Sequence, residues 1–239
     1  MSYDELRLYA EMVFDVQQFR ISAENKIRSA IVDPTFIGQA LKQYEATEHT
    51  LSLAMRRCMR KTVAPSITAW QKSQPGIGEH LLARLLATVG DPRWAEPKHW
   101  EGTGSERTLI DDEPHARTVS QLWSYCGVGD PTRVRRKGMT ADEGAALGNP
   151  RAKMVVHLLA EACIKQQGDY RKVYEQDRFN RGDVNGPEGW TSGSALTKGH
   201  SHNRALRRVK KQILKDLWIV AGGQPEGEPQ TAIAPGGES

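Results

Sequence analysis

Apolar residues recur at alternating steps of three and four up to residue 58, in two runs separated by Asp33-Pro34. Proline disfavours helical geometry in the residue before it, so this dipeptide ends the first run. The pattern predicts two long helices that form an antiparallel helical hairpin over residues 1–64. The periodic positions are Leu6, Tyr9, Val13, Val16, Ala23, Ile27 and Ala30 in the first run and Ile37, Ala40, Tyr44, Thr47, Leu51, Ala54 and Cys58 in the second.

Both apolar stripes of this hairpin are narrow, and neither is wide enough to be buried by the other helix alone. Two arrangements can cover the remaining apolar surface. The hairpin can pair with a second copy, or it can pack on the domain that follows. We expect a homodimer formed through the hairpin, and packing on the next domain remains the alternative.

The sequence Pro75-Gly76-Ile77-Gly78 joins a short predicted helix, residues 66–74, to a second one that ends near Gly90. Two helices joined by Pro-Gly-apolar-Gly are typical of a helix-hairpin-helix, a module that binds a nucleic-acid backbone. Glycines carry no side chain, so backbone N–H groups at the start of the second helix can approach a phosphate oxygen. Ile77 would anchor the turn between the helices. The alternative is an ordinary connection, because Pro and Gly mark turns in general.

Further helices separated by loops are predicted beyond this turn, so the fold class is all-α. Residues 91–115 should be an inserted irregular surface loop, whose acidic run Asp111-Asp112-Glu113 is more typical of the approach to a helix N-terminus than of a metal site. Helices are predicted over 116–126, from Pro150 with Asn149 as N-cap, and over 169–180. The middle one should turn six residues inward, namely Met154, Val155, Leu158, Leu159, Ala162 and Cys163.

The predicted divisions follow from these elements. They are the helical hairpin (1–64), a helix-hairpin-helix domain (65–182), a Gly-rich loop with a basic helix (183–220), and a disordered Gly/Pro/Glu-rich tail (221–239). In the basic helix, apolar positions 206, 209, 213 and 217 fall on one face and the cations on the opposite one.

Positive charge is concentrated in one part of the chain. Residues 120–215 carry 18 Lys and Arg against nine Asp and Glu, although the net charge of the whole chain is only +4. Such a regional excess indicates an anionic partner, and clustered guanidinium groups match phosphate oxygens. The candidate nucleic-acid-binding residues are Pro75, Gly76, Ile77, Gly78, Arg133, Arg135, Arg136, Lys137, Asn149, Arg151, Lys153, Arg204, Arg207, Arg208, Lys211 and Lys215.

Other function classes receive little support. The three cysteines are scattered and lack metal-ligand spacing, which favours a reducing cytosol over a disulfide framework. No signal peptide and no run of about 20 apolar residues is present. We therefore expect a soluble cytoplasmic protein without a membrane partner and without a metal site of its own.

The order of these features resembles the C-terminal half of the DEDD-type insertion-sequence transposases that work with a structured bridge RNA. The resemblance covers about residues 5–180. It implies a coiled coil and a transposase domain containing the helix-hairpin-helix, a role in DNA transposition and recombination, and DNA and structured RNA as partners. The segments that carry it are the hairpin, Pro75–Gly78 with the helix ending in Val89-Gly90-Asp91-Pro92, Ser120–Val128, and Gly148-Asn149-Pro150-Arg151-Ala152-Lys153.

Two features depart from that family. Its RuvC-like domain with four acidic metal ligands is not expected here, because the chain begins at the coiled coil; Mg²⁺ is therefore expected only with a separate RuvC-like partner. Its nucleophilic serine lies in the loop that corresponds to Gly127–Gly148, where Thr132 and Thr140 are the only hydroxyl residues.

Three function hypotheses remain. The first is a transposase-like protein that binds DNA, structured RNA or both without cutting. The second is an active strand-transfer enzyme in which Thr132 or Thr140 is the nucleophile and Arg135, Arg136 and Lys137 stabilise the pentacovalent phosphate. The third is a coiled-coil scaffold without affinity for nucleic acid.

Overall fold

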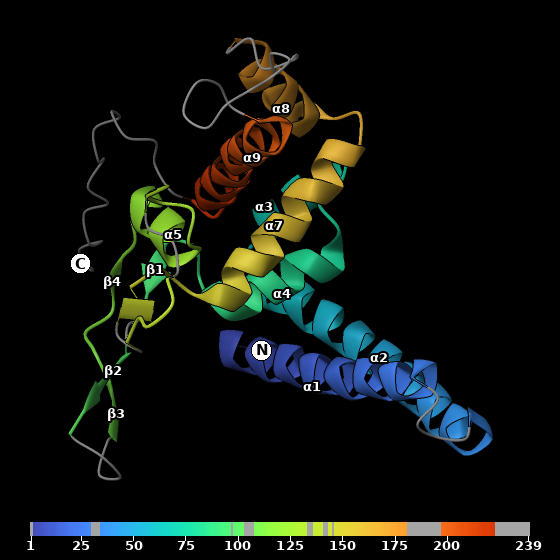
Figure 1. Cartoon of the computed structure of the whole chain (residues 1–239). Helices are drawn as coiled ribbons and strands as arrows, with labels where there is room; N and C mark the ends of the chain where they lie inside the picture. The colour runs from blue at the N-terminus through green and yellow to red at the C-terminus, as the bar shows by residue number, and fades with distance from the viewer. Residues whose placement is uncertain are drawn as a thin grey trace.

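The computed structural model describes residues 2–29, 34–96, 98–102, 108–132, 136–140, 143–144, 146–180 and 197–222, with the backbone alone at 34–36, 98–100 and 109. Within this part of the chain the protein is mostly helical, which confirms the predicted fold class (Figure 1). Residues 181–196 of the predicted Gly-rich segment and residues 223–239 of the predicted tail lie outside the described residues.

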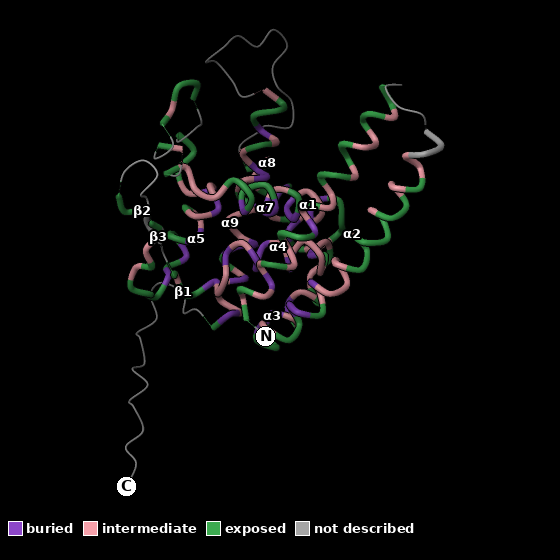
Figure 2. Tube along the Cα trace, turned by 90° about the horizontal axis from the view of Figure 1, so that it is seen from below, coloured by how far each residue is buried: buried purple, intermediate pink, exposed green. Residues whose placement is uncertain are grey.

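Helices α1 (Tyr3–Arg28) and α2 (Pro34–Thr62) form the predicted antiparallel hairpin, which projects from the helical body as an arm (Figure 1). The base of the arm packs against α4 (Glu79–Val89), and its buried residues are confined to the base (Figure 2). These are Leu6, Val13, Met55, Cys58 and Met59. Packing against α4 thus buries the apolar residues at the base of the arm. The homodimer stays a prediction.

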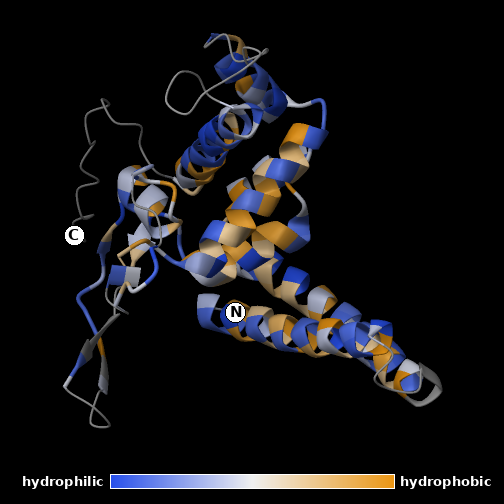
Figure 3. Ribbon diagram, viewed as in Figure 1, coloured by the Kyte–Doolittle hydropathy of each residue, from blue (hydrophilic) through white to orange (hydrophobic). Residues whose placement is uncertain are grey.

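Helix α7 (Pro150–Lys165) contacts α4, α8 (Asp169–Asn180) and α9 (Lys198–Val220). Apolar residues are concentrated on α4 and α7 (Figure 3). The prediction that Met154 and Leu158 point inward is wrong, because they are 41% and 37% exposed. The small residues Ala152 and Ala160 are fully buried instead, and they allow closer helix packing than the larger side chains would.

The described residues of the segment predicted to be an irregular loop, with the residue that follows it, contain four short strands. Strand β1 (Trp94–Ala95) pairs with β4 (His115–Ala116), and β2 (Lys98–Glu101) pairs with β3 (Thr108–Asp111), both antiparallel. Strands of two to four residues are too short to show a period-two pattern. The acidic run therefore ends β3 and leads to β4, and no helix follows it directly.

Helices α5 (Val119–Tyr125) and α9 close the body around α7. A capping box of Thr118 and Gln121 begins α5. Helix α9 buries Leu206, Val209, Ile213 and Leu217, as its pattern predicts. Among the described helices, none has the length and apolar character required to cross a membrane.

The turn between α3 (Pro65–Ser73) and α4 packs directly on the backbone of α7. Gly76 has a φ of 92°, and a Cβ added there would lie 2.5 Å from the Cys163 Cα atom. Ile77 is 3% exposed and anchors the turn as predicted, and its carbonyl accepts a 2.8 Å hydrogen bond from the Gln71 side chain. Gly76 is therefore required both by its backbone conformation and by close packing.

Gly76→Ala should destabilise the protein by about 2–4 kcal/mol, because it combines a left-handed backbone with overpacking. Gly78→Ala should change stability by less than about 1 kcal/mol, since Gly78 has a φ of −70° and open space around its Cα. Urea unfolding of both variants measures the difference. Equal stability of the two variants would show that the contact with α7 is not close.

Candidate nucleic-acid interface

Gly78 is the N-cap of α4 and supplies no side chain to the first turn of that helix. The first N–H groups of an α-helix have no partner within the helix, and here no side chain caps them. Two arginines at the end of α2 lie next to this turn. The Glu79 carboxylate is 3.3 Å from Arg60 and 3.9 Å from Arg56, so the cations outnumber the acid at the start of α4. The local charge and the exposed backbone both suit an anion.

The other residues of the turn have packing roles. Pro75 lies 3.4 Å from the position of a Cβ on Gly168, so it packs on the start of α8. Gly76 packs against the backbone of Cys163. Among the predicted turn residues, Gly78 thus leaves the most open approach to backbone N–H groups.

Asn149 begins α7 in the predicted manner. Its side-chain oxygen accepts hydrogen bonds from the N–H groups of Arg151 at 2.9 Å and Ala152 at 3.1 Å, and its amide donates to the Tyr125 hydroxyl at 3.1 Å. These N–H groups are therefore satisfied without a bound anion. The Arg151 guanidinium lies 4.7 Å from the centre of the Phe14 ring on α1.

The loop from Gly127 to Gly148 is described in parts. Arg133 and Arg135 lie outside the described residues, whereas Arg136 and Lys137 are exposed. The Thr132 hydroxyl donates to the Asp130 carboxylate at 2.7 Å, and the Thr140 hydroxyl donates to Glu143 at 3.1 Å. Each candidate nucleophile is thus hydrogen-bonded to a carboxylate in its own loop.

The five predicted cations of α9 have different surroundings. Arg204 forms an ion pair with Asp177 at 3.2 Å, Arg207 donates to the carbonyl groups of Val128 and Gly129, and Lys211 lies 4.6 Å from the centre of a Trp123 ring. Arg208 and Lys215 are exposed. The cation face therefore serves partly to attach α9 to the rest of the body.

A basic cluster forms where α7 meets α9. Lys153 packs its aliphatic stem against Gly127, and Arg207 contacts the next two residues of the same loop. Lys210, three residues after Arg207 on α9, is close enough to both cations to be affected by their charges. Its burial, together with Lys153 and Arg207, lowers its pKa from 10.5 to about 8, and Glu161 opposes the shift only in part.

The sequence pattern did not indicate Lys210 as a site residue. The available signal is its position four residues after Leu206, at the edge of the apolar stripe, where a lysine stem is half-buried and its amine is held near other charges. We call Lys153, Arg207 and Lys210 the α7–α9 basic cluster.

The candidate residues gather at opposite ends of α7. The α7–α9 basic cluster and the Gly127–Gly148 loop lie at its first turns, and the Gly76–Gly78 turn packs near Cys163. Cys163 follows Lys153 by ten positions along the helix, which corresponds to a rise of roughly 15 Å. One helical nucleic acid is long enough to contact both regions.

Lys210→Met should stabilise the protein at pH 7 by about 1 kcal/mol, a value reduced for solvent screening. The folded-state pKa of Lys210 is below its unfolded value, so the cost of burying its charge is fully present below pH 8 and is relieved as the pH rises from 8 to 10.5. Urea unfolding at pH 7 and pH 9.5 should show a smaller gain at the higher pH. Lys215→Met, an exposed control on the same helix, should show no such change, and an equal gain for Lys210→Met at both pH values contradicts the assignment.

The amino-acid sequence is similar to that of an insertion-element protein. Over 148 residues the chain is 24% identical to a protein of Streptomyces coelicolor described as "Insertion element IS110 uncharacterized 43.6 kDa protein". The match covers 62% of the chain and 27% of that relative, so the chain spans about a quarter of the relative's length. No family model matches, and no solved structure matches significantly. The similarity supports a distant relationship to IS110-type insertion-element proteins.

Proposed function

We propose that the chain is a transposase-like protein that binds DNA, structured RNA or both through phosphate contacts. The observation that carries this proposal is the α7–α9 basic cluster. Burial and neighbouring cations make the charge of Lys210 unfavourable in the free protein, and a phosphate beside it would offset that cost. The distant similarity to an IS110 insertion-element protein supports the same class of function.

The turn at Gly78 is the second contact in this proposal. Its uncapped N–H groups would donate to a phosphate oxygen, and Arg56 and Arg60 would add attraction at longer range. The exposed cations Arg136, Lys137, Arg208 and Lys215 would extend the contact along the strand. Binding of this kind needs no cofactor, and Mg²⁺ would enter only with a RuvC-like partner.

Gly78→Ala should weaken binding of a fluorescent duplex about tenfold, because the added Cβ blocks the approach of a phosphate to the start of α4. Affinity should be measured by fluorescence anisotropy at several salt concentrations, since each neutralised phosphate contributes about −0.9 to the slope of log K against log salt. The slope measured for the variant should be less negative by about 0.9, the contribution of one phosphate contact.

Gly38→Ala is the matched control, because Gly38 also has open space around its Cα but lies on the arm. Binding by the wild-type protein that is independent of salt would exclude phosphate contacts. No affinity for any nucleic acid would favour the scaffold hypothesis instead.

A second candidate function is strand transfer, which is favoured by the 2.7 Å hydrogen bond from Thr132 to Asp130. A carboxylate so placed can accept the hydroxyl proton as the oxygen attacks a phosphate. If the protein is an active transposase, a covalent protein–DNA adduct should form with a RuvC-like partner and Mg²⁺, and Thr132→Val should abolish it. An adduct that persists in Thr132→Val but not in Thr140→Val would assign the role to Thr140, and no adduct in any of these proteins would remove this candidate.

A further inference from the structure

A cleft of about 620 Å³ is lined by none of the three residues of the α7–α9 basic cluster. It is enclosed by α1, the C-terminal half of α4, the β1–β4 pair, α5 and the N-terminal end of α7. Its volume is in the range of small-ligand sites. The lining combines four aromatic side chains, Tyr3, Phe14, Trp94 and Tyr125, with four arginines, Arg7, Arg84, Arg117 and Arg151.

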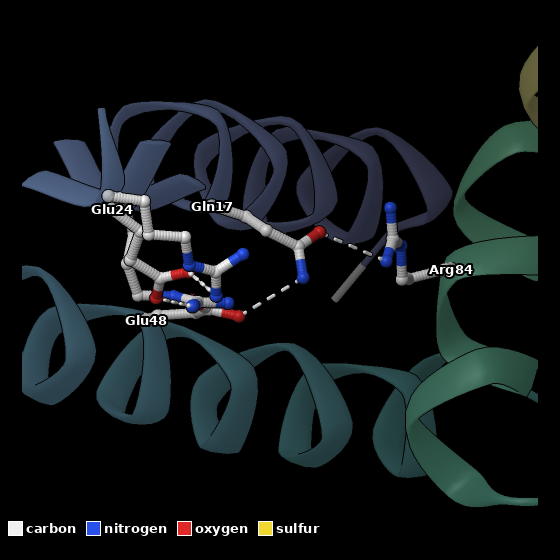
Figure 4. Close-up of polar contacts among 6 residues, drawn as sticks. Gln17, Glu24, Glu48 and Arg84 are labelled. Carbon is white, nitrogen blue, oxygen red and sulfur yellow. Dashed lines mark hydrogen bonds and ion pairs between the residues drawn. The ribbon is translucent and has the colours of Figure 1, made fainter. Parts of the chain in front are cut away.

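Arg84 is held in this cleft by a polar network from the arm (Figure 4). Its guanidinium donates to the Gln17 side chain at 3.5 Å, and Gln17 donates to Glu48 at 3.3 Å. Glu48 in turn accepts a 2.7 Å hydrogen bond from Arg20. An amide therefore stands between Arg84 and the nearest carboxylate of the network. Within the described residues no carboxylate contacts Arg84, so its charge is oriented but not neutralised.

Arg151 brings a second guanidinium to the same cleft. It rests on the Phe14 ring, and the carboxylate of Glu11 is 4.0 Å away with both side chains 52% exposed. Such an exposed pair is weak. Burial lowers the pKa of Arg84 while Glu48 opposes the shift, and Arg151 lowers the pKa further. Two cations that repel each other in a cleft bind an anion together better than either would alone.

The β1–β4 side of the cleft presents a different chemistry. Trp94 is 44% exposed, and its indole offers a flat face for stacking. The acids Asp91 and Glu96 and the side chains of Gln121 and Asn149 also line the cleft. This mixture of donors and acceptors suits the edge of a base better than it suits a row of phosphates. The lining thus has a cationic end that suits a phosphate, formed by Arg84 and Arg151, and a stacking end at Trp94.

We propose that this cleft binds one nucleotide unit, with its phosphate between Arg84 and Arg151 and its base against Trp94. The unit can be an unpaired nucleotide of a bound strand or a free mononucleotide. The first source rests on the proposed function, and the second does not. In both cases stacking and charge act on the same unit.

The test compares three probes: a mononucleotide (AMP), a 5′-phosphorylated single-stranded dodecanucleotide, and its blunt duplex. Binding is followed by calorimetry with the wild-type protein and with Arg84→Gln, Arg84→Lys and Trp94→Ala. Arg84→Gln and Trp94→Ala should each weaken binding of the single strand about tenfold or more, and Arg84→Lys should restore part of it. Arg28→Gln, an exposed arginine on the arm, is the matched control and should have no effect. Urea unfolding establishes that each variant folds.

The outcomes separate this inference from the proposed function. If AMP binds with the same dependence on Arg84 and Trp94, the cleft accepts a free nucleotide; if only the single strand does, the unit is an unpaired nucleotide. Equal binding of single strand by wild type, Arg84→Gln and Trp94→Ala overturns the inference, and duplex binding that still depends on Gly78 then leaves the proposed function intact. AMP binding by a protein with no affinity for strands supports the cleft and overturns the proposed function.

Discussion

The close approach of Gly76 to the Cys163 backbone is the contact on which the arrangement of the helices depends. It places the α3–α4 turn against α7 at a distance that excludes any side chain, and the buried Ile77 locks the turn there. Helix α4 then runs back along α7 and offers its remaining surface to the arm. The position of the arm, the cleft beneath it and the start of α4 therefore all follow from one glycine contact.

The basic residues divide into cations that stabilise the body and cations that remain accessible. Arg204 and Arg207 attach α9 to α8 and to the loop after α5, and Lys211 packs on an aromatic ring. Such contacts use guanidinium and ammonium groups as structural donors. Arg208 and Lys215, on the outer face of the same helix, remain exposed. The number of cations on α9 thus exceeds the number that a ligand can reach. The half-buried Lys210 differs from the exposed cations because burial lowers its pKa.

The arm is connected to the body by polar contacts as well as by packing. Its base buries apolar residues against α4, and further along it the Arg20–Glu48–Gln17 chain reaches Arg84 (Figure 4). Because these hydrogen bonds cross from the arm to the wall of the cleft, a displacement of the arm would change the orientation of a cleft arginine. The arm and the cleft are in this way mechanically linked.

The sequence by itself determined the helices, their caps and the turn, because these depend on local periodicity and on residues such as Asn149, Pro150 and Gly90 that act within a few positions. It also indicated that Ile77 is an anchor. Only the tertiary structure decided that Gly76 serves packing, that Met154 and Leu158 face outward, and that β1 to β4 form two short antiparallel pairs. Tertiary structure likewise brought Lys153 to Lys210 and Arg84 to Arg151. All of these features depend on contacts between residues far apart in the chain, and a local sequence pattern does not indicate which distant residues come together.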